Sequence, residues 1–327
     1  MQTYRYRGLH GEIERVLPRS GFALGLVGNG IAHSLSPALH AQALSQIGVP
    51  GSFETIDCKD DLSATLAIDR LRGGEFHGLN MTTPFKILAR DQCTAWLGDP
   101  AGIVRKPASV NTLLMRDSQL CGTSTDGAGL VAALRRAHVE LVGKRALLIG
   151  AGGAAQAVAP ALIAAGLRTL IVTNRSDDHA KSLASSQHGA QWLPWGQTAG
   201  LGRVDLIVHA TSVGHGVAGA QSALEMAQPF AWLPWEKSAQ QGTVLADLVY
   251  APTLTAVQFL AQQHGFRCDN RLLPSHRPSA HVAYKSSQPR GILCGFGQVM
   301  LGAQAALSFW QWTGAWVNVD EMLAAVL

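Results

Sequence analysis

Four short polar segments in the first 130 residues carry side chains that could bind and transform a small molecule. These side chains are Ser34 and Ser36 in HSLSP, Asn80, Thr82 and Lys86 in NMTTPFK, Asn111 in SVNT, and Asp126 in STDG. They offer hydroxyls, amides, one amine and one carboxylate, an inventory that suits a small polyhydroxylated acid. Two hydroxyls at the spacing of Ser34 and Ser36 could both reach one carboxylate of such a ligand.

Lys86 and Asp126 are the candidates for acid–base chemistry. A hydride transfer between a carbinol and a nicotinamide ring needs a group that takes or returns the hydroxyl proton, and a lysine oriented by a carboxylate can do this. The alternative is that Lys86 is a surface lysine at a helix end and Asp126 is a helix cap. Spacing alone supports both interpretations equally.

A second chemical signal is the glycine-rich segment GAGGAAQA. Gly150, Gly152 and Ala155 stand at the fixed positions of G-x-G-x-x-[G/A], between an expected strand and an expected helix. Such a turn lets the backbone approach a pyrophosphate, and the amino end of the helix then offers N–H groups to the anion. The alternative is a glycine-rich turn of ordinary α/β packing.

The segment TNRS, at the end of the next expected strand, indicates which dinucleotide is bound. Asn174, Arg175 and Ser176 stand where an NAD-specific domain would have an acidic residue, and a guanidinium suits the 2′-phosphate of NADP. We therefore expect NADP. The following Asp177 and Asp178 leave NAD possible, and a surface salt bridge from Arg175 to them is the alternative.

The elements that must position these residues read as two α/β series. Strands are expected over 22–28, 52–58, 76–84, 145–150, 168–174, 204–211 and 242–250, with helices over 37–48, 60–72 and 297–312. This order predicts two open parallel-sheet α/β domains with a cleft between them, the second of Rossmann type. We place the substrate-binding domain at 1–126 plus 299–327, because Gln304 has to face the first pocket, and the nucleotide domain at 127–298.

Within the second domain, residues 271–295 show no periodicity and are expected to form a surface insertion. A metal site built from this region is the disfavoured alternative, because the candidate ligands match no common zinc spacing. Those candidates are His264, Cys268, His276, His281 and Cys294. No metal is therefore expected.

Composition excludes several classes of protein. The 327 residues are 47% hydrophobic and 15% charged, which is typical of a globular chain rather than a disordered one. Lysine plus arginine (26) barely exceeds aspartate plus glutamate (22) and is not clustered, so neither nucleic acid nor a membrane is an expected partner. The five cysteines form no C-x-x-C pair, which favours buried, reduced thiols in a cytoplasmic protein. The uncharged run 146–167 is interrupted by glycines and is expected to be a buried strand, turn and helix.

Nine segments in this order resemble the shikimate and quinate/shikimate dehydrogenase family. They are GNGIAHSLSP, GLNMTTPFK, SVNT, GTSTDGAGL, GAGGAA, TNRS, ATSVG, DLVYAPTLT and GQVMLGAQAAL. The resemblance implies reversible NADP-dependent reduction of 3-dehydroshikimate to shikimate, within aromatic amino acid biosynthesis. It implies catalysis by Lys86 and Asp126. The implied substrate-binding residues are Ser34, Ser36, Asn80, Thr82, Asn111, Asp126, Tyr250 and Gln304, and the implied cofactor-binding residues are Gly150, Ala151, Gly152, Gly153, Ala154, Asn174, Arg175, Ser176, Leu248 and Gly297.

The sequence departs from the family pattern mainly near the expected nicotinamide end. The unusual residues are Gly30, Ser124, His209, His215 and Phe296. The alternatives are therefore a quinate or aminoshikimate dehydrogenase that uses NAD or NADP, and a non-catalytic sensor of shikimate and NADP. Small molecules are the expected partners, for a monomer or a homodimer.

Overall fold

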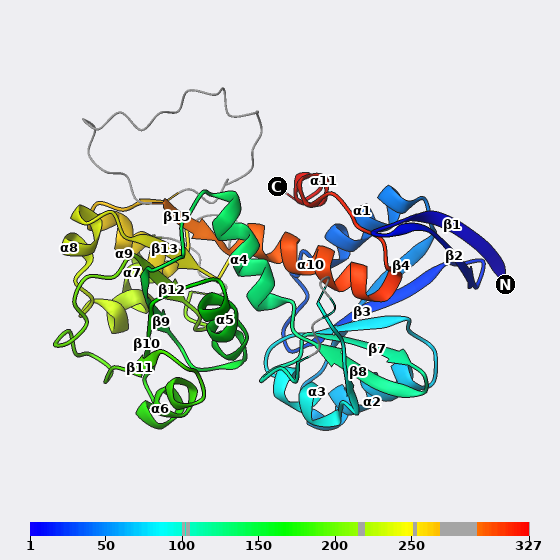
Figure 1. Cartoon of the computed structure of the whole chain (residues 1–327), viewed down its shortest axis with the longest axis horizontal. Coiled ribbons are helices and arrows are strands. Elements are labelled where there is room, and N and C mark those ends of the chain that lie inside the picture. The colour runs from blue at the N-terminus through cyan, green and yellow to red at the C-terminus, as the bar shows by residue number, and fades with distance from the viewer. Residues whose placement is uncertain (100–101, 103–104, 215–219, 251–253, 269–292, 327) are drawn as a thin grey trace. The chain divides into compact units, whose positions relative to one another are not determined.

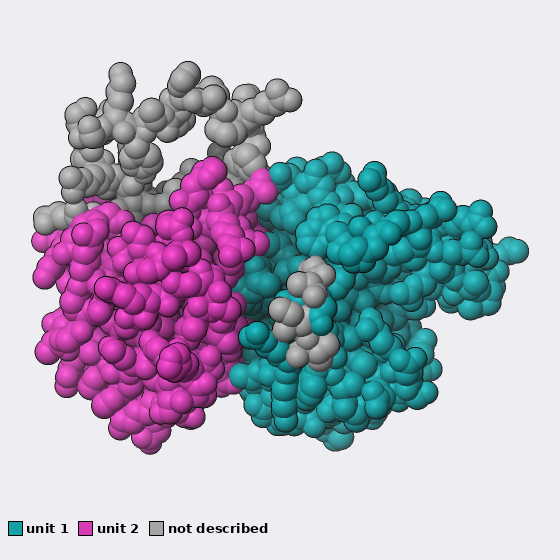
Figure 2. Space-filling model, viewed as in Figure 1, with its two compact units in different colours: residues 1–129, 301–327 teal, residues 130–300 magenta. Residues whose placement is uncertain are grey.

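The chain divides into two compact units. The structure, a computed structural model, describes residues 1–99, 102, 105–214, 220–250, 254–268 and 293–326. Unit 1 comprises Met1–Gly129 and Leu301–Leu327, and unit 2 comprises Leu130–Met300 (Figure 2). The sequence predicted these divisions at 126/127 and 298/299. The predicted insertion at 271–295 lies almost entirely outside the described residues.

Unit 1 contains a six-stranded sheet in the order β4-β3-β5-β7-β8-β6. Its strands are β3 (Phe22–Gly28), β4 (Gly51–Asp57), β5 (Gly78–Met81), β6 (Ala95–Trp96), β7 (Thr112–Arg116) and β8 (Gln119–Thr123). Strands β3, β4 and β5 are parallel, as predicted, whereas β7 is antiparallel to both β5 and β8. The β7–β8 hairpin was not predicted, because its turn residues Asp117 and Ser118, with φ of 49° and 61°, are not the usual Asn-Gly pair.

Helices cover both faces of this sheet. They are α1 (Ser36–Ile47), α2 (Asp61–Arg72), α3 (Lys86–Gln92) and the second half of α10 (Gly297–Thr313). Figure 1 shows α2 and α3 on one face and α1 and α10 on the other. Helix α2 begins at a capping box, in which Asp60 accepts from the backbone N–H of Ser63 at 2.8 Å. Val27, Ile68 and Leu79 are buried in the core under α2 and α3.

The first 17 residues form a hairpin that the sequence analysis did not anticipate. Strands β1 (Gln2–Gly8) and β2 (Gly11–Leu17) pair only with each other. The Tyr6 hydroxyl donates to the carbonyl oxygen of Thr313 at 2.9 Å, and the Leu9 N–H donates to Gly314 at 3.2 Å. These bonds tie the hairpin to the end of α10. The short α11 (Val319–Ala324) follows.

Unit 2 contains a seven-stranded sheet in the order β11-β10-β9-β12-β13-β15-β14, in which every pair is parallel. Its strands are β9 (Arg145–Ile149), β10 (Thr169–Thr173), β11 (Ala190–Trp192), β12 (Leu206–His209), β13 (Val244–Asp247), β14 (Arg267–Cys268) and β15 (Leu293–Phe296). The chain moves outward from β9 in one direction through β10 and in the other through β12. The carboxyl ends of β9 and β12 therefore flank a topological switch point, where dinucleotides bind in such sheets.

The helices of unit 2 are α4 (Asp126–Arg136), which begins in unit 1, α5 (Gly153–Ala164), α6 (Asp177–Ser185), α7 (Ala220–Ala227), α8 (Trp235–Gln240) and α9 (Ala256–Gln263). The uncharged run 146–167 divides into β9, the glycine turn and α5, as predicted. Among the helices described, none is long and apolar enough to cross a membrane. The prediction of α/β domains with parallel sheets, the second of Rossmann type, is confirmed, with the β7–β8 hairpin as an addition.

Candidate functional site

Lys86 and Asp126 form a short, largely buried ion pair in unit 1. The distance from Lys86 Nζ to Asp126 Oδ2 is 2.6 Å, and the two side chains are only 13% and 7% exposed. Lys86 is the first residue of α3 and Asp126 the first residue of α4. The alternative of a surface lysine is therefore wrong. Asp126 does begin a helix, but its carboxylate contacts Lys86.

Asn111 connects this pair to the other polar side chains. Its amide nitrogen lies 2.9 Å from Asp126 Oδ1 and 3.0 Å from Gln304 Oε1. Its amide oxygen accepts from the backbone N–H of Thr125 at 2.8 Å. Both oxygens of Asp126 thus have a partner, one on Lys86 and one on Asn111, so the carboxylate is held in a single orientation.

The antiparallel course of β7 explains why these segments meet. Asn80, near the end of β5, lies opposite Thr112, the first residue of β7, and Thr112 lies opposite Thr123, the last residue of β8. The start of β7 therefore reaches the same sheet edge as the carboxyl ends of β5 and β8. Asn111 directly precedes β7, so the antiparallel course of that strand brings Asn111 to the same edge.

Ser308 is a member of this cluster that the sequence analysis missed. It is fully buried, and its hydroxyl lies 3.0 Å from the amide nitrogen of Asn80, 2.7 Å from Thr112 Oγ1 and 3.1 Å from Thr125 Oγ1. Ser308 follows Gln304 by one helical turn of α10, so the two share a face. The spacing of four residues from Gln304 is the sequence signal that could have identified Ser308.

Ser34, Ser36 and Thr82 follow the neighbouring strands β3 and β5. Ser34 Oγ accepts from the backbone N–H of Ser36 at 3.2 Å, where α1 begins without a side-chain cap. Thr82 continues the sheet by donating its N–H to Val27 at 2.9 Å. All three come after the carboxyl ends of parallel strands, at the edge that carries Asn80.

In unit 2 the glycine turn has the geometry that a pyrophosphate requires. Gly150 has a φ of 119°, and an added Cβ would lie 2.8 Å from the carbonyl oxygen of Ala210. Gly152 precedes α5 with no side-chain cap, and an added Cβ there would meet nothing within 4 Å. Ala151 and Ala155 are buried beneath. The turn thus leaves an open approach to the amino end of α5, which fits a dinucleotide phosphate.

Arg175 is exposed directly after β10. It forms no ion pair with any residue in the described part of the chain. Asp178 lies 4.0 Å from Lys181 instead, and Asp177 accepts from the N–H of Trp195 at 3.4 Å. Asn174 donates to the carbonyl oxygen of Ser176 at 3.1 Å, which closes the turn. The predicted alternative, a salt bridge from Arg175 to the aspartates, is therefore not observed, and the guanidinium is available to a phosphate.

His209, noted in the sequence only as a departure, belongs to a buried network at the strand ends of unit 2. Its Nδ1 lies 2.8 Å from Asp247 Oδ1 and its Nε2 lies 2.5 Å from Thr211 Oγ1, and both His209 and Asp247 are inaccessible to solvent. Asp247 also accepts from the Thr255 hydroxyl and from the N–H of Val249. These contacts give both ring nitrogens of His209 a hydrogen-bond partner.

This network adjoins Leu248 and Gly297, two of the predicted cofactor-binding residues. The N–H of Leu248 donates to His209 O at 3.0 Å, and a Cβ on Gly297 would lie 2.6 Å from Val249 O. Phe296, before Gly297, is buried with a φ of 87°. Tyr250 lies in unit 2, unlike the other predicted substrate-binding residues. His215 lies outside the described residues.

The metal alternative gains no support from the part of the chain that the structure describes, which contains no group of three potential ligands. His276, His281 and the side chains of Cys268 and Cys294 lie outside that part. Cys58, Cys93 and Cys121 are free thiols. Burial raises the pKa of all three, that of Cys93 to about 12, which keeps them protonated and unreactive at neutral pH.

Two family models match the chain. The model of the shikimate dehydrogenase substrate binding domain matches residues 26–113, and that of shikimate / quinate 5-dehydrogenase matches residues 132–230. A shikimate dehydrogenase (NADP(+)) of Xanthomonas campestris pv. campestris is 34% identical over 95% of this chain and 96% of its own length. A shikimate dehydrogenase (NADP(+)) from an Exiguobacterium species is 32% identical over 93% of this chain and 97% of its own length. The chain belongs to the shikimate dehydrogenase family.

Solved structures agree with this membership. A shikimate 5-dehydrogenase from Thermus thermophilus, in complex with NADP(H) and shikimate, has a TM-score of 0.69 at 30% identity, over 93% of this chain and 98% of its own. A ligand-free 5-ketofructose reductase of Gluconobacter has a TM-score of 0.67 at 22% identity, over 93% and 97%. The second likeness concerns the fold alone, which the shikimate dehydrogenase family shares with an enzyme named for another substrate.

Proposed function

We propose that this chain catalyses the reversible, NADP-dependent reduction of 3-dehydroshikimate to shikimate. The observation that carries the proposal is the buried Lys86–Asp126 pair, fixed at 2.6 Å beside Asn111 and Gln304 at the sheet edge of unit 1. An ordered amine next to a set of amides and hydroxyls is what a carbinol substrate with several ring hydroxyls requires. Membership of the family supports the same reaction.

In the reduction, Lys86 transfers a proton from its ammonium to the substrate carbonyl oxygen, which becomes the new hydroxyl. NADPH, when bound, would supply the hydride that forms the new C–H bond. Asp126 keeps the amine oriented through its 2.6 Å contact, and solvent returns the proton that Lys86 has given up. In the reverse direction Lys86 accepts the hydroxyl proton, so the same pair serves both directions.

Binding of the acid is assigned to the remaining side chains of the edge. Ser34 and Ser36 would donate hydroxyl hydrogen bonds to the substrate carboxylate, next to the amino end of α1. Asn80, Thr82, Asn111 and Gln304 would bind ring hydroxyls, with Ser308 holding Asn80 in place. Tyr250 is proposed as a further contact. These roles follow from polar chemistry at one sheet edge and from the positions of the family motifs.

The dinucleotide is assigned to the strand ends of unit 2. Gly150, Ala151, Gly152, Gly153 and Ala154 would receive the pyrophosphate at the amino end of α5. Asn174, Arg175 and Ser176 would surround the 2′-phosphate, and Leu248 and Gly297 would lie at the nicotinamide end. The exposed guanidinium, and relatives named for NADP(+), support NADP over NAD.

Steady-state assay of the purified chain with shikimate and NADP⁺, followed by NADPH absorbance, tests the proposal. Lys86→Met should lower kcat by about 10²- to 10⁴-fold, because a positioned proton-transfer group contributes that much. Lys144→Met is the matched control, since Lys144 lies on unit 2 with a side chain that is 42% exposed. Absence of NADPH formation by the wild type, or equal kcat values for the two variants, would contradict the proposal.

A sensor that binds shikimate without turnover is disfavoured, because the proton-transfer pair is complete. Calorimetry that shows tight shikimate binding by an inactive wild type would revive it.

Quinate carries an additional hydroxyl on the carbon that bears the carboxylate. The two serines Ser34 and Ser36 favour the smaller shikimate, and kcat/KM values for shikimate, quinate and aminoshikimate decide between the three acids.

We further infer that the protein works in the cytoplasm as a monomer or a homodimer. The three free thiols of the described residues suit a reducing compartment. Cell fractionation tests the first statement, and size-exclusion chromatography with light scattering distinguishes the two oligomeric states.

A further inference from the structure

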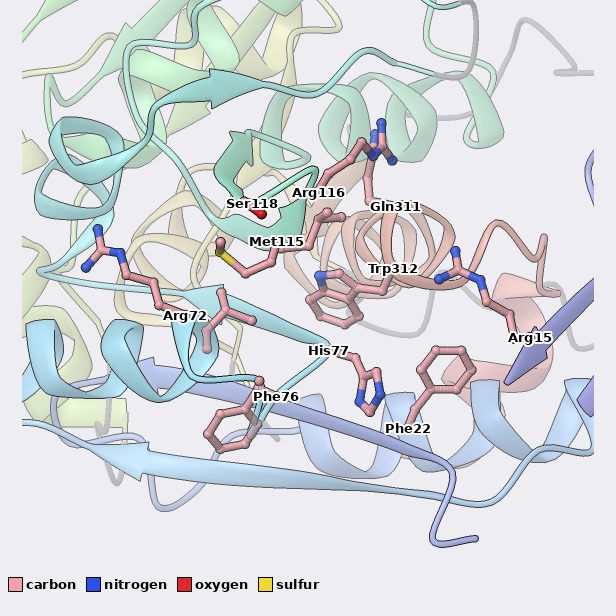
Figure 3. Close-up of a pocket in the computed structure, with 13 residues that line it drawn as sticks. Arg15, Phe22, Arg72, Phe76, His77, Met115, Arg116, Ser118, Gln311 and Trp312 are labelled. Carbon is pink, nitrogen blue, oxygen red and sulfur yellow. The ribbon is translucent and has the colours of Figure 1, made fainter. Parts of the chain in front are cut away.

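Unit 1 contains a cavity of about 500 Å³ that the proposed reaction does not use (Figure 3). Its size falls within the range of small-molecule sites. The apolar part of its lining includes Phe22, Phe76 and Trp312, and each of these side chains is less than 9% exposed. Three arginines and one histidine also line it, whereas none of the described aspartates or glutamates does. The cavity therefore combines an aromatic floor with basic side chains and no acidic side chain among the described residues.

The cavity lies at the opposite sheet edge from Lys86 and Asp126. Phe22 is the first residue of β3, whereas the substrate segment HSLSP follows its last residue, Gly28. His77 directly precedes β5, and Arg116 ends the antiparallel β7. At about 3.3 Å per residue, a strand of this length separates the two edges by roughly 20 Å. A ligand in the cavity would not occupy the proposed substrate site.

Two of the three arginines have no partner for their charge in the described part of the chain. Arg72 pairs with Asp69 at 2.7 Å, but neither Arg15 nor Arg116 forms an ion pair with any residue the structure describes. Arg15 lines the cavity together with His77. Burial raises the pKa of the nearby Tyr6 hydroxyl, and the charge of Arg15 opposes that rise. Arg15, whose side chain is exposed, thus places a guanidinium beside the aromatic floor.

His77 adds a neutral donor beside Arg15. Its Nδ1 accepts from the backbone N–H of Ala23 at 3.0 Å, so the proton of the neutral ring resides on Nε2. Burial, and secondarily Arg15, lowers the pKa of His77, so the ring is neutral at pH 7. Its ring packs edge-on against Phe22 with centroids 5.5 Å apart. A guanidinium and an imidazole N–H therefore adjoin one apolar surface.

The wall that carries Arg15 comes from a segment outside the family match. Arg15 belongs to β2 of the amino-terminal hairpin, whereas the match to the substrate-binding domain begins at residue 26. The bond from Tyr6 to Thr313 fixes this hairpin on the end of α10, beside Trp312. The hairpin is therefore anchored to unit 1 and contributes Arg15 to the wall of the cavity.

We propose that this cavity is a second binding site, for a small monocarboxylate with a flat apolar body. The carboxylate would pair with Arg15 and accept from His77 Nε2–H, since a guanidinium binds a planar carboxylate through two hydrogen bonds. The apolar body would lie against Phe22 and Trp312. The site does not depend on the proposed reaction, because no residue of the Lys86 cluster takes part.

Isothermal titration of the full chain with benzoate, without shikimate or NADP, tests this site. We expect one site that binds benzoate at least tenfold tighter than benzamide, its uncharged counterpart. Arg15→Met should weaken benzoate at least tenfold, whereas Arg7→Met should not, because Arg7 is exposed on the same hairpin and does not line the cavity. Arg116→Met provides a second variant, with an expected weakening of the same sign, should Arg15→Met fail to fold.

Benzoate is itself a cyclic carboxylic acid, so the substrate site must be separated from this one. Titration should give the same affinity in the presence of saturating shikimate and in Lys86→Met. Displacement of benzoate by shikimate, or equal benzoate affinity in Arg15→Met, Arg7→Met and the wild type, would overturn the proposal. Neither result bears on catalysis, which the NADPH assay measures separately.

Discussion

Asn111 shows how single side chains set the chemistry of the first unit. Its amide nitrogen lies within 3.0 Å of acceptors on Asp126, Thr125 and Gln304, so its two hydrogens are shared among three oxygens. Its oxygen accepts from the backbone of Thr125. A residue with both donors and an acceptor is needed at this point, which explains why a carboxylate or a hydroxyl could not replace it without leaving a buried group unpaired.

At the residue scale, Arg175 should determine the preference between the two dinucleotides. Arg175→Ala is expected to raise the KM for NADP⁺ at least tenfold and to leave that for NAD⁺ nearly unchanged, because only NADP carries the 2′-phosphate. Steady-state kinetics with both cofactors measures the difference. Arg203→Ala is the control, since Arg203 is also exposed on unit 2. A parallel rise in both KM values would contradict a role at the 2′-phosphate.

His40 should make the stability of unit 1 depend on pH. Burial lowers its pKa from 6.5 to about 3, and its ring stacks on Phe53 with centroids 4.4 Å apart. Between these two pKa values the unfolded chain binds a proton that the folded chain does not. The contribution is therefore fully present above pH 6.5 and is lost as the pH falls toward 3, by about 1.4 kcal/mol per pH unit.

Urea unfolding at several pH values between 4 and 8 measures this dependence. His40→Phe keeps an aromatic ring against Phe53 but cannot be protonated, so its free energy of unfolding should fall less steeply below pH 6.5 than that of the wild type. His10→Phe, at an exposed position of the hairpin turn, should keep the wild-type slope. Identical slopes for His40→Phe and the wild type would show that His40 does not carry the effect.

At the scale of elements, the ends of β12 and β13 are joined by the His209–Asp247 pair. His209→Ala would leave a fully buried carboxylate with its bonds from Thr255 and Val249 only. We expect a loss of about 2 kcal/mol in stability and weaker NADPH binding, because Asp247, the residue before Leu248, loses its imidazole partner. NADPH fluorescence titration and thermal unfolding measure the two effects.

His209→Asn distinguishes positioning from simple filling of space. An asparagine can still donate to Asp247, so it should restore NADPH affinity to within a few-fold of the wild type, whereas His209→Leu, of similar bulk, should not. Equal affinities for the asparagine and leucine variants would remove the positioning role of His209.

At the scale of the whole molecule, the proposed substrate and cofactor sites belong to different compact units, Tyr250 excepted, and each unit has its own sheet and buried core. Hydrogen exchange should therefore show that NADP⁺ alone protects residues 150–156 and 174–176, and that shikimate alone protects 80–86 and 111–126. A ligand at 100 times its Kd stabilises the unit that binds it by about 2.7 kcal/mol. If NADP⁺ protected only residues 80–86 and 111–126, the assignment of the cofactor site to unit 2 would be contradicted.

The sequence by itself determined the elements whose pattern is local. Strand β3 has its predicted bounds, and β9, the Gly150 turn and α5 follow from an apolar run, glycines and alanines that lie next to one another. The positions of Lys86 and Asp126 within ordered motifs also indicated the chemistry. Each of these signals depends on residues a few positions apart, which is the range over which backbone preference and periodicity act.

Only the tertiary structure decided which distant residues meet. Asn111 and Gln304 are 193 positions apart and become neighbours because β7 runs antiparallel to β5 and α10 packs on the same sheet. Ser308 and the cavity wall at Arg15 depend likewise on where α10 and the hairpin pack. Pairing direction and packing register are set by the burial of whole faces, which no short stretch of sequence encodes.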